Sequence, residues 1–363
     1  MTKFDIVDLA GREVAMRLER NESCENANHV DVVILGAGPA GAATAIQCAR
    51  HGLRVFLIER AEFPRSAPGE TLHPGLLPLL KELGVEDRVL SAGFLRHEGH
   101  HVHWNEPERF IAFGDDATGP WLGLQAWRPD FDAILLERSR ELGAIICKPD
   151  HVTDLVMDNR HIIGVETATR AVSTSFIVDA TGRRRWLAQK MGLKTEYHSA
   201  RRIAWYGYAE GDCPARAKAP VLRADSTGWT WVARVRSNIY QWTRLNLNNH
   251  RPQEGWMPDE LVGLRSCGRV CGADVTWRIA LKPADANYFL VGDAACILDP
   301  ASSHGVLKAI MSGMMASYLI ARIKSGYVSN EFAARHYSDW IRRSFEHDRA
   351  HLSTLYSKLI FPS

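Results

Sequence analysis

The order of apolar and polar positions predicts alternating strands and helices at the start of the chain. An apolar run at residues 30–35 is followed by a glycine-rich turn, an alanine-rich stretch at 41–50 and a second apolar run at 54–58. This order is typical of a βαβ unit, in which one helix connects two parallel strands. Two further helices are predicted, each ending at a glycine that can close its last turn: residues 76–83 and 130–142.

A different pattern covers residues 94–125 and 200–281. The segment His101-Val102-His103-Trp104 alternates polar with apolar positions, and the later stretch is rich in tryptophan, tyrosine and β-branched residues. Both patterns favour half-buried antiparallel strands. The rest of the chain predicts strands at 151–157, 162–167, 174–178 and 288–291, and helices at 11–20, 306–323 and 329–359. We therefore predict an α/β fold in which a parallel-sheet domain is interrupted by an antiparallel sheet.

Composition and charge narrow the class of protein. The 363 residues are 46% hydrophobic and 24% charged, with a formal net charge of +2, so about two domains are expected and no basic field favours nucleic acid. We expect no transmembrane segment, because no run of 18 apolar residues occurs, and no signal peptide in residues 1–29. The 7 cysteines are scattered and predict neither a disulfide framework nor a metal site at Cys267 and Cys271, which favours a cytoplasmic protein.

The turn after the first strand carries a dinucleotide-binding fingerprint. It reads Gly36-Ala37-Gly38-Pro39-Ala40-Gly41: Gly36 permits the tight turn, Gly38 lets the backbone approach a pyrophosphate, and Gly41 lets the helix pack on the strand. Pro39 and Ala40 open the helix whose N–H groups would bind the pyrophosphate. Glu59, at the end of the next strand and followed by Arg60, can accept the ribose hydroxyls. Its charge would repel a 2′-phosphate, so FAD or NAD is expected rather than NADP.

The end of the chain points to FAD. An apolar strand runs into Gly292-Asp293-Ala294, followed by Asp299-Pro300 and a helix that begins near Gly305 and Val306. This pattern resembles the flavoprotein monooxygenases, which implies that Asp293 binds the ribityl chain. The N–H groups of the helix after Pro300 would then face N1 and O2 of the flavin, where reduced flavin carries negative charge. The alternatives are that Asp293 only caps a helix and that Pro300 only forms a turn.

Two further segments carry the same resemblance. Asp179-Ala180-Thr181-Gly182 resembles the turn at which these proteins pass the nucleotide, which makes Asp179, Thr181 and Gly182 cofactor candidates. Arg128 resembles the arginine that contacts the flavin side of the cofactor, although it could instead only pair with Asp132. The resemblance implies a glutathione-reductase-type FAD-binding Rossmann domain with an inserted antiparallel-sheet substrate domain and C-terminal helices. The expected boundaries are an extension at 1–29, an FAD-binding domain at 30–90, 126–199 and 282–328, a substrate domain at 91–125 and 200–281, and C-terminal helices at 329–363.

Gly69-Glu70-Thr71 resembles the Gly-Glu-Ser/Thr motif of tryptophan halogenases, geranylgeranyl reductases and related hydroxylases. Gly228-Trp229-Thr230-Trp231 is similar to a halogenase segment, but Ala233-Arg234 replaces its Ile-Pro. Halogenases also need a lysine beside the substrate. Between Arg60 and Lys148 the chain has only Lys81, and Arg96 stands where the catalytic lysine is expected. Arginine stays charged and forms a chloramine poorly, so halogenation is disfavoured at this stage.

Residues 299–308 most resemble the LodB, GoxB and QhpG flavoproteins, which mature cysteine tryptophylquinone in a partner protein. This resemblance implies a monooxygenase that hydroxylates a tryptophan of a precursor polypeptide through a flavin C4a-hydroperoxide, with dioxygen as co-substrate. NADH or a separate flavin reductase would supply the electrons. The alternatives are a prenyl-lipid reductase, a halogenase or hydroxylase of a small aromatic molecule, and a flavoprotein chaperone without turnover.

The candidate site residues follow from these motifs. Ser302 and His304 are catalytic candidates because they lie beside the expected position of the flavin ring, and Glu70 of the Gly69-Glu70-Thr71 motif is the third. The candidates for the substrate pocket are Arg96, Tyr206, Trp229 and Trp231, although aromatic residues on a sheet more often form its core. A metal site is not expected at the histidine-rich stretch, since strand alternation sends neighbouring side chains to opposite faces: His97, His100, His101 and His103.

Overall fold

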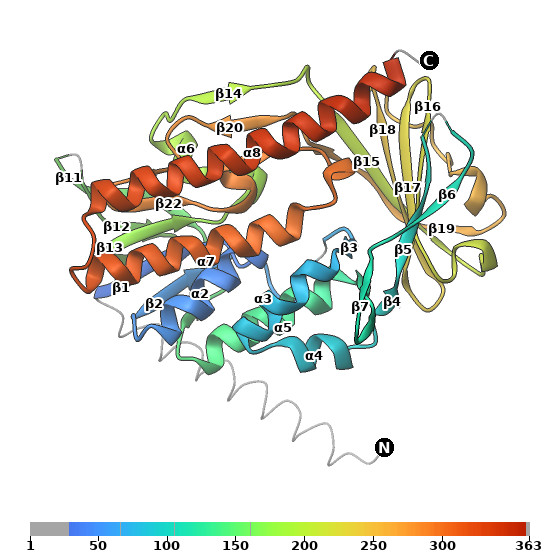
Figure 1. Ribbon diagram of the computed structural model, residues 1–363. Helices are drawn as coiled ribbons and strands as arrows, with labels where there is room; N and C mark the ends of the chain where they lie inside the picture. Colours follow the sequence, from blue (N-terminus) through green and yellow to red (C-terminus); the bar gives the residue numbers. More distant parts are fainter. Residues whose placement is uncertain (1–28, 66, 105, 160, 361–363) are drawn as a thin grey trace.

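The computed structural model describes residues 29–65, 67–104, 106–159 and 161–360, and it contains two large sheets joined by helices (Figure 1). The helix predicted at residues 11–20 lies outside the described residues. The first sheet has eight strands, in the order β10-β2-β1-β13-β12-β11, with β22 beside the second half of β13 and β21 beside β22. Parallel pairing joins β1 (His29–Leu35), β2 (Val55–Ile58), β10 (Ile145–Cys147), β13 (Ala171–Asp179) and β22 (Tyr288–Leu290). The antiparallel members are β11 (Val152–Asp158), β12 (His161–Thr167) and β21 (Ala284–Asp285).

Helices α2 (Pro39–Arg50), α5 (Arg128–Glu141) and α7 (Gly305–Lys324) pack beside this sheet. The crossing of α2 and α7 is close, because a Cβ at Gly313 would lie 2.4 Å from the carbonyl oxygen of Ala40. By length and composition α7 could cross a membrane, but half of it is buried inside the protein, as in a core helix. The shorter helices are α3 (Leu77–Leu83), α4 (Glu86–Ser91) and α6 (Trp186–Lys190).

The second sheet has seven strands, in the order β19-β15-β18-β17-β16-β5-β6. Two segments that are far apart in the sequence meet in this sheet, where β16 pairs with β5. This pair is parallel, and all the other strand pairs of the sheet are antiparallel. Its strands are β5 (Gly99–His103), β6 (Arg109–Ala112), β15 (Ile203–Glu210), β16 (Val221–Asp225), β17 (Gly228–Arg236), β18 (Ile239–Asn246) and β19 (Arg265–Asp274). Smaller sheets connect the two large ones: β3 (Glu70–Leu72) with β9 (Gly123–Ala126) and β4 (Leu95–His97), β14 (Thr195–Tyr197) with β20 (Arg278–Ala280) and β23 (Cys296–Ile297), and β7 (Asp115–Asp116) with β8 (Gly119–Pro120).

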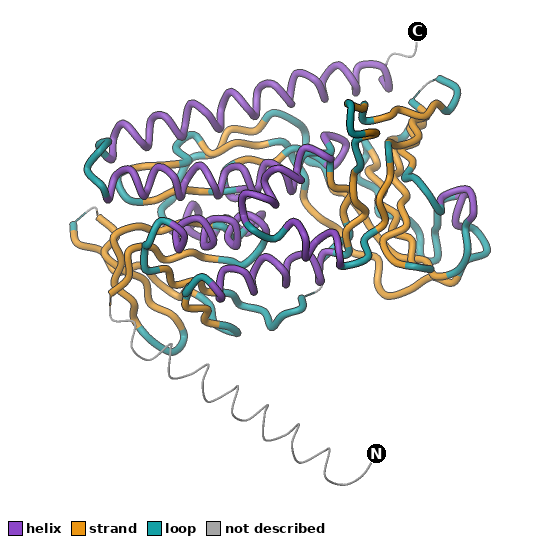
Figure 2. Tube along the Cα trace, turned by 60° about the horizontal axis from the view of Figure 1, so that its bottom comes forward, coloured by secondary structure: helices purple, strands orange, loops and turns teal. Residues whose placement is uncertain are grey.

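The predicted α/β fold, with its interrupting antiparallel sheet, is confirmed. The helix predicted at 329–359 is also found, as one long helix, α8 (Asn330–Ile360). Figures 1 and 2 both show α8 running beside α7 from the first sheet to the second. Buried residues such as Tyr337 and Phe345 hold it on the first sheet, and Leu352 and Tyr356 hold it on the second.

Candidate functional site

The fingerprint residues Gly36–Gly41 form a turn, which we call the cradle, in which backbone atoms of neighbouring segments come close together. Gly36 has φ +100°, and a Cβ there would lie 2.6 Å from the carbonyl oxygen of Ala180. A Cβ at Gly41 would lie 1.9 Å from the carbonyl oxygen of Gly36, so only glycine fits. Gly38 precedes the first turn of α2, where Pro39 and Ala40 lie. The N-terminus of α2 can therefore receive a pyrophosphate, as the sequence predicts.

Glu59 is buried and held in one orientation. Its Oε2 accepts the N–H of Ala37 at 2.9 Å, and its Oε1 accepts the N–H of Ala61 at 2.9 Å. Each carboxylate oxygen keeps a lone pair for a ribose hydroxyl. Arg60, in contrast, is exposed, and it is Arg65 that lies at the cradle, with Nη2 3.1 Å from the position of a Cβ on Gly38. No sequence motif pointed to Arg65.

Asp179 does not have the position expected for a cofactor ligand. It is fully buried, its Oδ1 accepts the N–H and hydroxyl of Thr181 at 2.9 and 2.6 Å, and its Oδ2 accepts the N–H of Leu187 at 2.9 Å. The prediction that Asp179 contacts the cofactor is therefore wrong, because the residue has no exposed surface and its oxygens hold the turn from inside. Thr181 and Gly182 in the same turn remain partly exposed and can face a ligand.

Arg128 forms ion pairs with two carboxylates of the protein, Asp132 and Glu70. Its Nε and Nη2 donate to Asp132 at 2.7 and 3.0 Å, and its Nη1 donates to Glu70 at 3.2 Å. This supports the alternative that Arg128 pairs with Asp132, and it makes Arg128 the residue that positions Glu70. The Glu70 side chain keeps 37% of its surface exposed, although protein atoms surround its carboxylate. Burial there raises its pKa to about 7, with Arg128 opposing the shift and Asp293 adding to it.

Asp293 follows β22 and remains half-exposed next to the cradle. Burial raises its pKa, against the opposing charges of Arg183, Arg128 and Arg278. A carboxylate in this place can accept hydrogen bonds from the hydroxyls of a ribityl chain. The glycine cradle, Glu59 and Asp293 therefore fit FAD, which supplies redox chemistry when bound.

Residues 299–305 form the segment that we call the flavin loop. Pro300–Ser302 make one 3₁₀ turn, Ser303 takes the left-handed conformation with φ 57°, and α7 begins at Gly305. Pro300 is exposed, whereas the side chain of Val306 is buried in the core, so only the backbone of Val306 can face a ligand. The N-terminus of α7 is thus free of a side-chain cap and can receive a negatively charged group.

His304 lies at a cavity between α7 and α8, which is lined on this side by Asp293, Ser302, Lys308 and Asp348. Its Nδ1 is 3.4 Å from Oδ2 of Asp348, and Lys308 forms an ion pair with the same carboxylate. Although burial opposes it, hydrogen bonding to His304 and Lys308 holds the pKa of Asp348 below its ordinary value. The sequence predicts His304 and Ser302 as catalytic candidates. It does not distinguish Asp348 from the other polar residues of α8.

The candidates for the substrate pocket separate into two groups. Tyr206 and Trp231 both pair with Thr243 in the second sheet, so they share a face, and both are partly exposed. Trp229 shares that face but is completely buried under Tyr356 of α8, so the prediction that it lines a pocket is wrong. Arg96 is exposed, while its neighbour His97 points inward.

The histidine-rich stretch packs around Phe113. The rings of His73, His97 and His100 have their centroids 5.3, 5.3 and 5.8 Å from that of Phe113, and burial lowers the pKa of His100 to about 4. His101 faces elsewhere and pairs with Glu108, and His103 is exposed. The described part of the chain contains no group of three or more His, Cys, Asp or Glu residues arranged to hold a metal ion.

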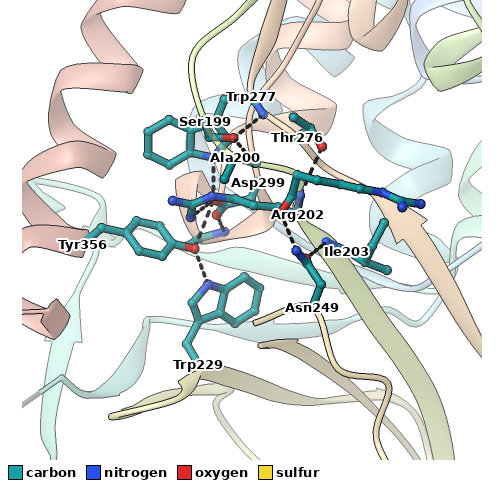
Figure 3. A network of polar contacts seen from close by, with 12 residues as sticks. Ser199, Ala200, Arg202, Ile203, Trp229, Asn249, Thr276, Trp277, Asp299 and Tyr356 are labelled. Carbon is teal, nitrogen blue, oxygen red and sulfur yellow. Dashed lines mark hydrogen bonds and ion pairs between the residues drawn. The ribbon is translucent and has the colours of Figure 1, made fainter. Parts of the chain in front are cut away.

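A buried polar network holds the start of the flavin loop (Figure 3). Asp299 is fully buried, and its Oδ2 accepts hydrogen bonds from Trp277 Nε1 at 2.6 Å and Tyr356 Oη at 3.0 Å. Tyr356 in turn accepts the Nε1–H of Trp229 at 2.7 Å. The guanidinium carbon of Arg202 lies 4.1 Å from the Tyr356 ring centroid and 4.5 Å from that of Trp277, which supplies the compensating charge. This network was not predicted, because its members come from distant parts of the sequence.

The fold and the site define an FAD-dependent oxidoreductase. A family model described as FAD binding domain matches residues 29–248, and the chain belongs to this family. The chain is 26% identical to a flavin-dependent halogenase, armH3, of Armillaria mellea, over 87% of this chain and 72% of that one. It is 25% identical to tryptophan 2-halogenase of Chondromyces crocatus, over 84% of this chain and 64% of that one.

Solved structures agree on the architecture. The flavin-dependent brominase Bmp2 superposes with a TM-score of 0.76 at 25% identity, over 86% of this chain and 84% of that one. The chondrochloren halogenase CndH has a TM-score of 0.83 at 23% identity, over 91% and 83% of the two chains, and this likeness concerns the fold alone. The relatives do not support a particular resemblance to the LodB, GoxB and QhpG flavoproteins. They favour halogenation or hydroxylation of aromatic molecules over the tryptophylquinone pathway.

Proposed function

We propose that the protein uses reduced FAD and dioxygen to substitute an electron-rich aromatic ring, with halogenation of a small or carrier-held aromatic molecule as the first candidate. The observation that carries this is the match to halogenases over most of the chain, including 26% identity over 85% of it with a brominase of pyrrole-carbonyl carrier protein from Pseudoalteromonas luteoviolacea. For halogenation the balance is Ar–H, a halide, a proton, dioxygen and reduced FAD going to Ar–X, oxidised FAD and two waters. A separate flavin reductase would renew the reduced cofactor.

The residues of the site would bind the parts of FAD and the aromatic substrate. Gly38 and the start of α2 would receive the pyrophosphate, Asp293 the ribityl chain, and the start of α7 the negative edge of the flavin. Tyr206 and Trp231 would stack against the flat substrate from the second sheet. An electron-rich ring needs no strong base before it attacks, but it must lose a proton afterwards.

The positions of the lysines favour a second candidate, hydroxylation. Between Arg60 and Lys148 the chain has only Lys81, which is exposed on α3. Lys308 does line the cavity beside His304, but it is paired with Asp348. If no lysine is available beside the substrate to direct the halogen, the same site would hydroxylate an aromatic ring. One such ring is a tryptophan side chain presented by a polypeptide. Here Ar–H, dioxygen and reduced FAD go to Ar–OH, oxidised FAD and one water.

Mass spectrometry separates these candidates. The protein is loaded with FAD, reduced, and exposed to oxygen with indole, phenol or a tryptophan-containing peptide, each with and without bromide. A bromine isotope doublet on indole or phenol supports the first candidate, and one added oxygen on the peptide, unaffected by bromide, supports the second. Consumption of reduced flavin with no modified aromatic product under any condition would contradict both.

A further inference from the structure

We infer that Asp348 of the C-terminal helix orients His304, so that Nε2 of His304 takes the proton released when the aromatic ring is substituted. The inference rests on the proposed function, and it applies equally to halogenation and hydroxylation. His304 would be the catalytic residue, because it would touch the reacting ring. Asp348 would be a positioning residue, since it acts through His304.

The geometry around Asp348 determines which ring nitrogen is available. Asp348 has 7% of its surface exposed, and its Oδ2 lies 3.4 Å from Nδ1 of His304 while pairing with Lys308. The 3.4 Å contact is an ion-pair distance, and an ionised carboxylate can only accept, so this arrangement favours the tautomer in which Nδ1 carries the proton. In the neutral imidazole Nε2 is then the basic nitrogen, as in other carboxylate–histidine pairs. Lys308 also donates to the carbonyl oxygen of Ser344 at 2.9 Å, so it is itself anchored to α8.

Two hollows share His304. The first is lined by Asp293 and Cys296 among others, and the second by Ser302, His347, Asp348 and His351. The ring of His73 also lies 5.9 Å from that of His304, centroid to centroid. The titratable groups that face His304 are thus Lys308 on α7, Asp348, His347 and His351 on α8, and His73 before α3. The cavity is lined by two carboxylates, Asp293 and Asp348, and Asp348 is the one that lies within ion-pair distance of His304, so it is placed to stabilise a protonated His304.

Helix α8 holds the flavin loop at both ends. Tyr356 bonds Asp299, where the loop begins, and Asp348 pairs with His304, where it ends. Ser344, Asp348, Leu352 and Tyr356 are four residues apart, so they lie along one stripe of the helix. His304 is therefore fixed relative to the α7 N-terminus by a helix that also closes the cavity.

The proton balance of the step is simple. The ring carbon forms its bond to the incoming halogen or oxygen, which leaves that carbon bonded to both hydrogen and the new atom. The C–H electron pair then restores the aromatic ring, and the proton moves to Nε2 of His304. Asp348 stabilises the resulting imidazolium through Nδ1, and solvent in the cavity can later remove the proton.

The test uses the FAD-loaded full chain with Asp348→Ala, Asp348→Asn and His304→Gln. The matched control is Asp339→Ala, which removes an exposed carboxylate from the same helix. ¹⁵N NMR of labelled histidine, with His304 assigned from the His304→Gln spectrum, reports which nitrogen carries the proton. We expect Nδ1–H in the parent and in Asp348→Asn, where the amide oxygen still accepts, and loss of this preference in Asp348→Ala.

Turnover of indole and phenol, with and without bromide, supplies the second measurement. We expect kcat to fall about 100-fold in His304→Gln and about tenfold in Asp348→Ala, with KM nearly unchanged and Asp339→Ala like the parent. An unchanged His304 tautomer in Asp348→Ala, or an unchanged kcat in His304→Gln, would overturn the inference. If the parent converts neither probe, the proposed function fails for them, and the tautomer measurement then decides the inference alone.

Discussion

The hydroxyl of Tyr356 lies 3.0 Å from Oδ2 of Asp299 and donates to it, because the same hydroxyl already accepts the Nε1–H of Trp229 at 2.7 Å. A directed chain of hydrogen bonds thus runs from the second sheet, through the C-terminal helix, to the first residue of the flavin loop (Figure 3). Because every member is buried, each lost partner leaves an unsatisfied polar group.

Tyr356→Phe should therefore destabilise the protein. It removes the acceptor of Trp229 and one donor of Asp299, and leaving such groups unpaired costs about 1–3 kcal/mol. Urea denaturation of the mutant and parent measures the loss. Tyr318→Phe is the control, because Tyr318 is 51% exposed on α7. Equal stability of Tyr356→Phe and the parent would show that the chain of hydrogen bonds is not formed in solution.

The two tryptophans of β17 should respond differently to substitution. Trp229→Ala empties a fully buried position and should cost about 3–5 kcal/mol of unfolding free energy. Trp231→Ala, at a partly exposed position on the same face, should cost less stability and raise KM for an aromatic substrate. Thermal denaturation and steady-state kinetics separate these effects. If Trp231→Ala left KM unchanged while turnover was measurable, Trp231 would not contact the substrate.

Glu59→Ala should weaken FAD binding by about 1–3 kcal/mol, because hydrogen bonds between a carboxylate and the ribose are lost. Titration of the apoprotein with FAD, followed by quenching of flavin fluorescence, gives the affinity. The control is Glu62→Ala, which removes a carboxylate that is 61% exposed and paired with Lys148. Circular dichroism of both variants checks that the loss of the bonds to Ala37 and Ala61 has not unfolded the cradle. Unchanged affinity would place Glu59 away from the ribose.

Glu70 should make the stability of the FAD-free protein fall as pH rises. Its pKa in the folded state is raised to about 7, above that of an unfolded glutamate, so the folded protein holds a proton that the unfolded chain has lost. Stability contributed by that proton is lost as pH rises from the unfolded pKa through about 7. Denaturation between pH 5 and pH 8 should show a shallower decline in Glu70→Gln than in the parent, whereas Glu62→Gln should follow the parent. Identical pH profiles for Glu70→Gln and the parent would contradict the raised pKa.

Replacing Gly41 by alanine should abolish tight FAD binding or folding of the cradle. The added Cβ would lie 1.9 Å from the carbonyl oxygen of Gly36, which is backbone and cannot move away cheaply. Gly326→Ala is the comparison, since Gly326 lies beyond the far end of α7 and, although its φ is +72°, a Cβ there would meet no atom within 4 Å. Retention of the flavin absorbance after gel filtration measures the outcome. Full flavin retention in Gly41→Ala would remove the steric argument for this position.

Local sequence was sufficient wherever the physical cause is local. The glycines at 36, 38 and 41 follow an apolar strand and open a helix, and only this arrangement brings a backbone close to a pyrophosphate. Asp293 after the returning strand similarly predicts the cofactor, and the alternating tryptophans and tyrosines of residues 200–281 predict the second sheet. Each of these signals lies within about ten residues, where spacing fixes geometry.

Contacts between distant segments had to be decided by the tertiary structure. Trp229 and Trp231 have equivalent positions in the strand pattern, and only the passage of α8 over the sheet buries one and leaves the other partly exposed. Asp179 and Arg128 belong to sequence motifs, but both form their hydrogen bonds with other protein groups. Arg65 and Asp348 belong to no motif, yet Arg65 lies near Gly38 and Asp348 lies near His304. A sequence pattern determines on which face of a strand or helix a side chain lies. The segment that packs against that face is determined by the tertiary structure. That packing decides which polar groups are already paired within the protein and which remain available for chemistry.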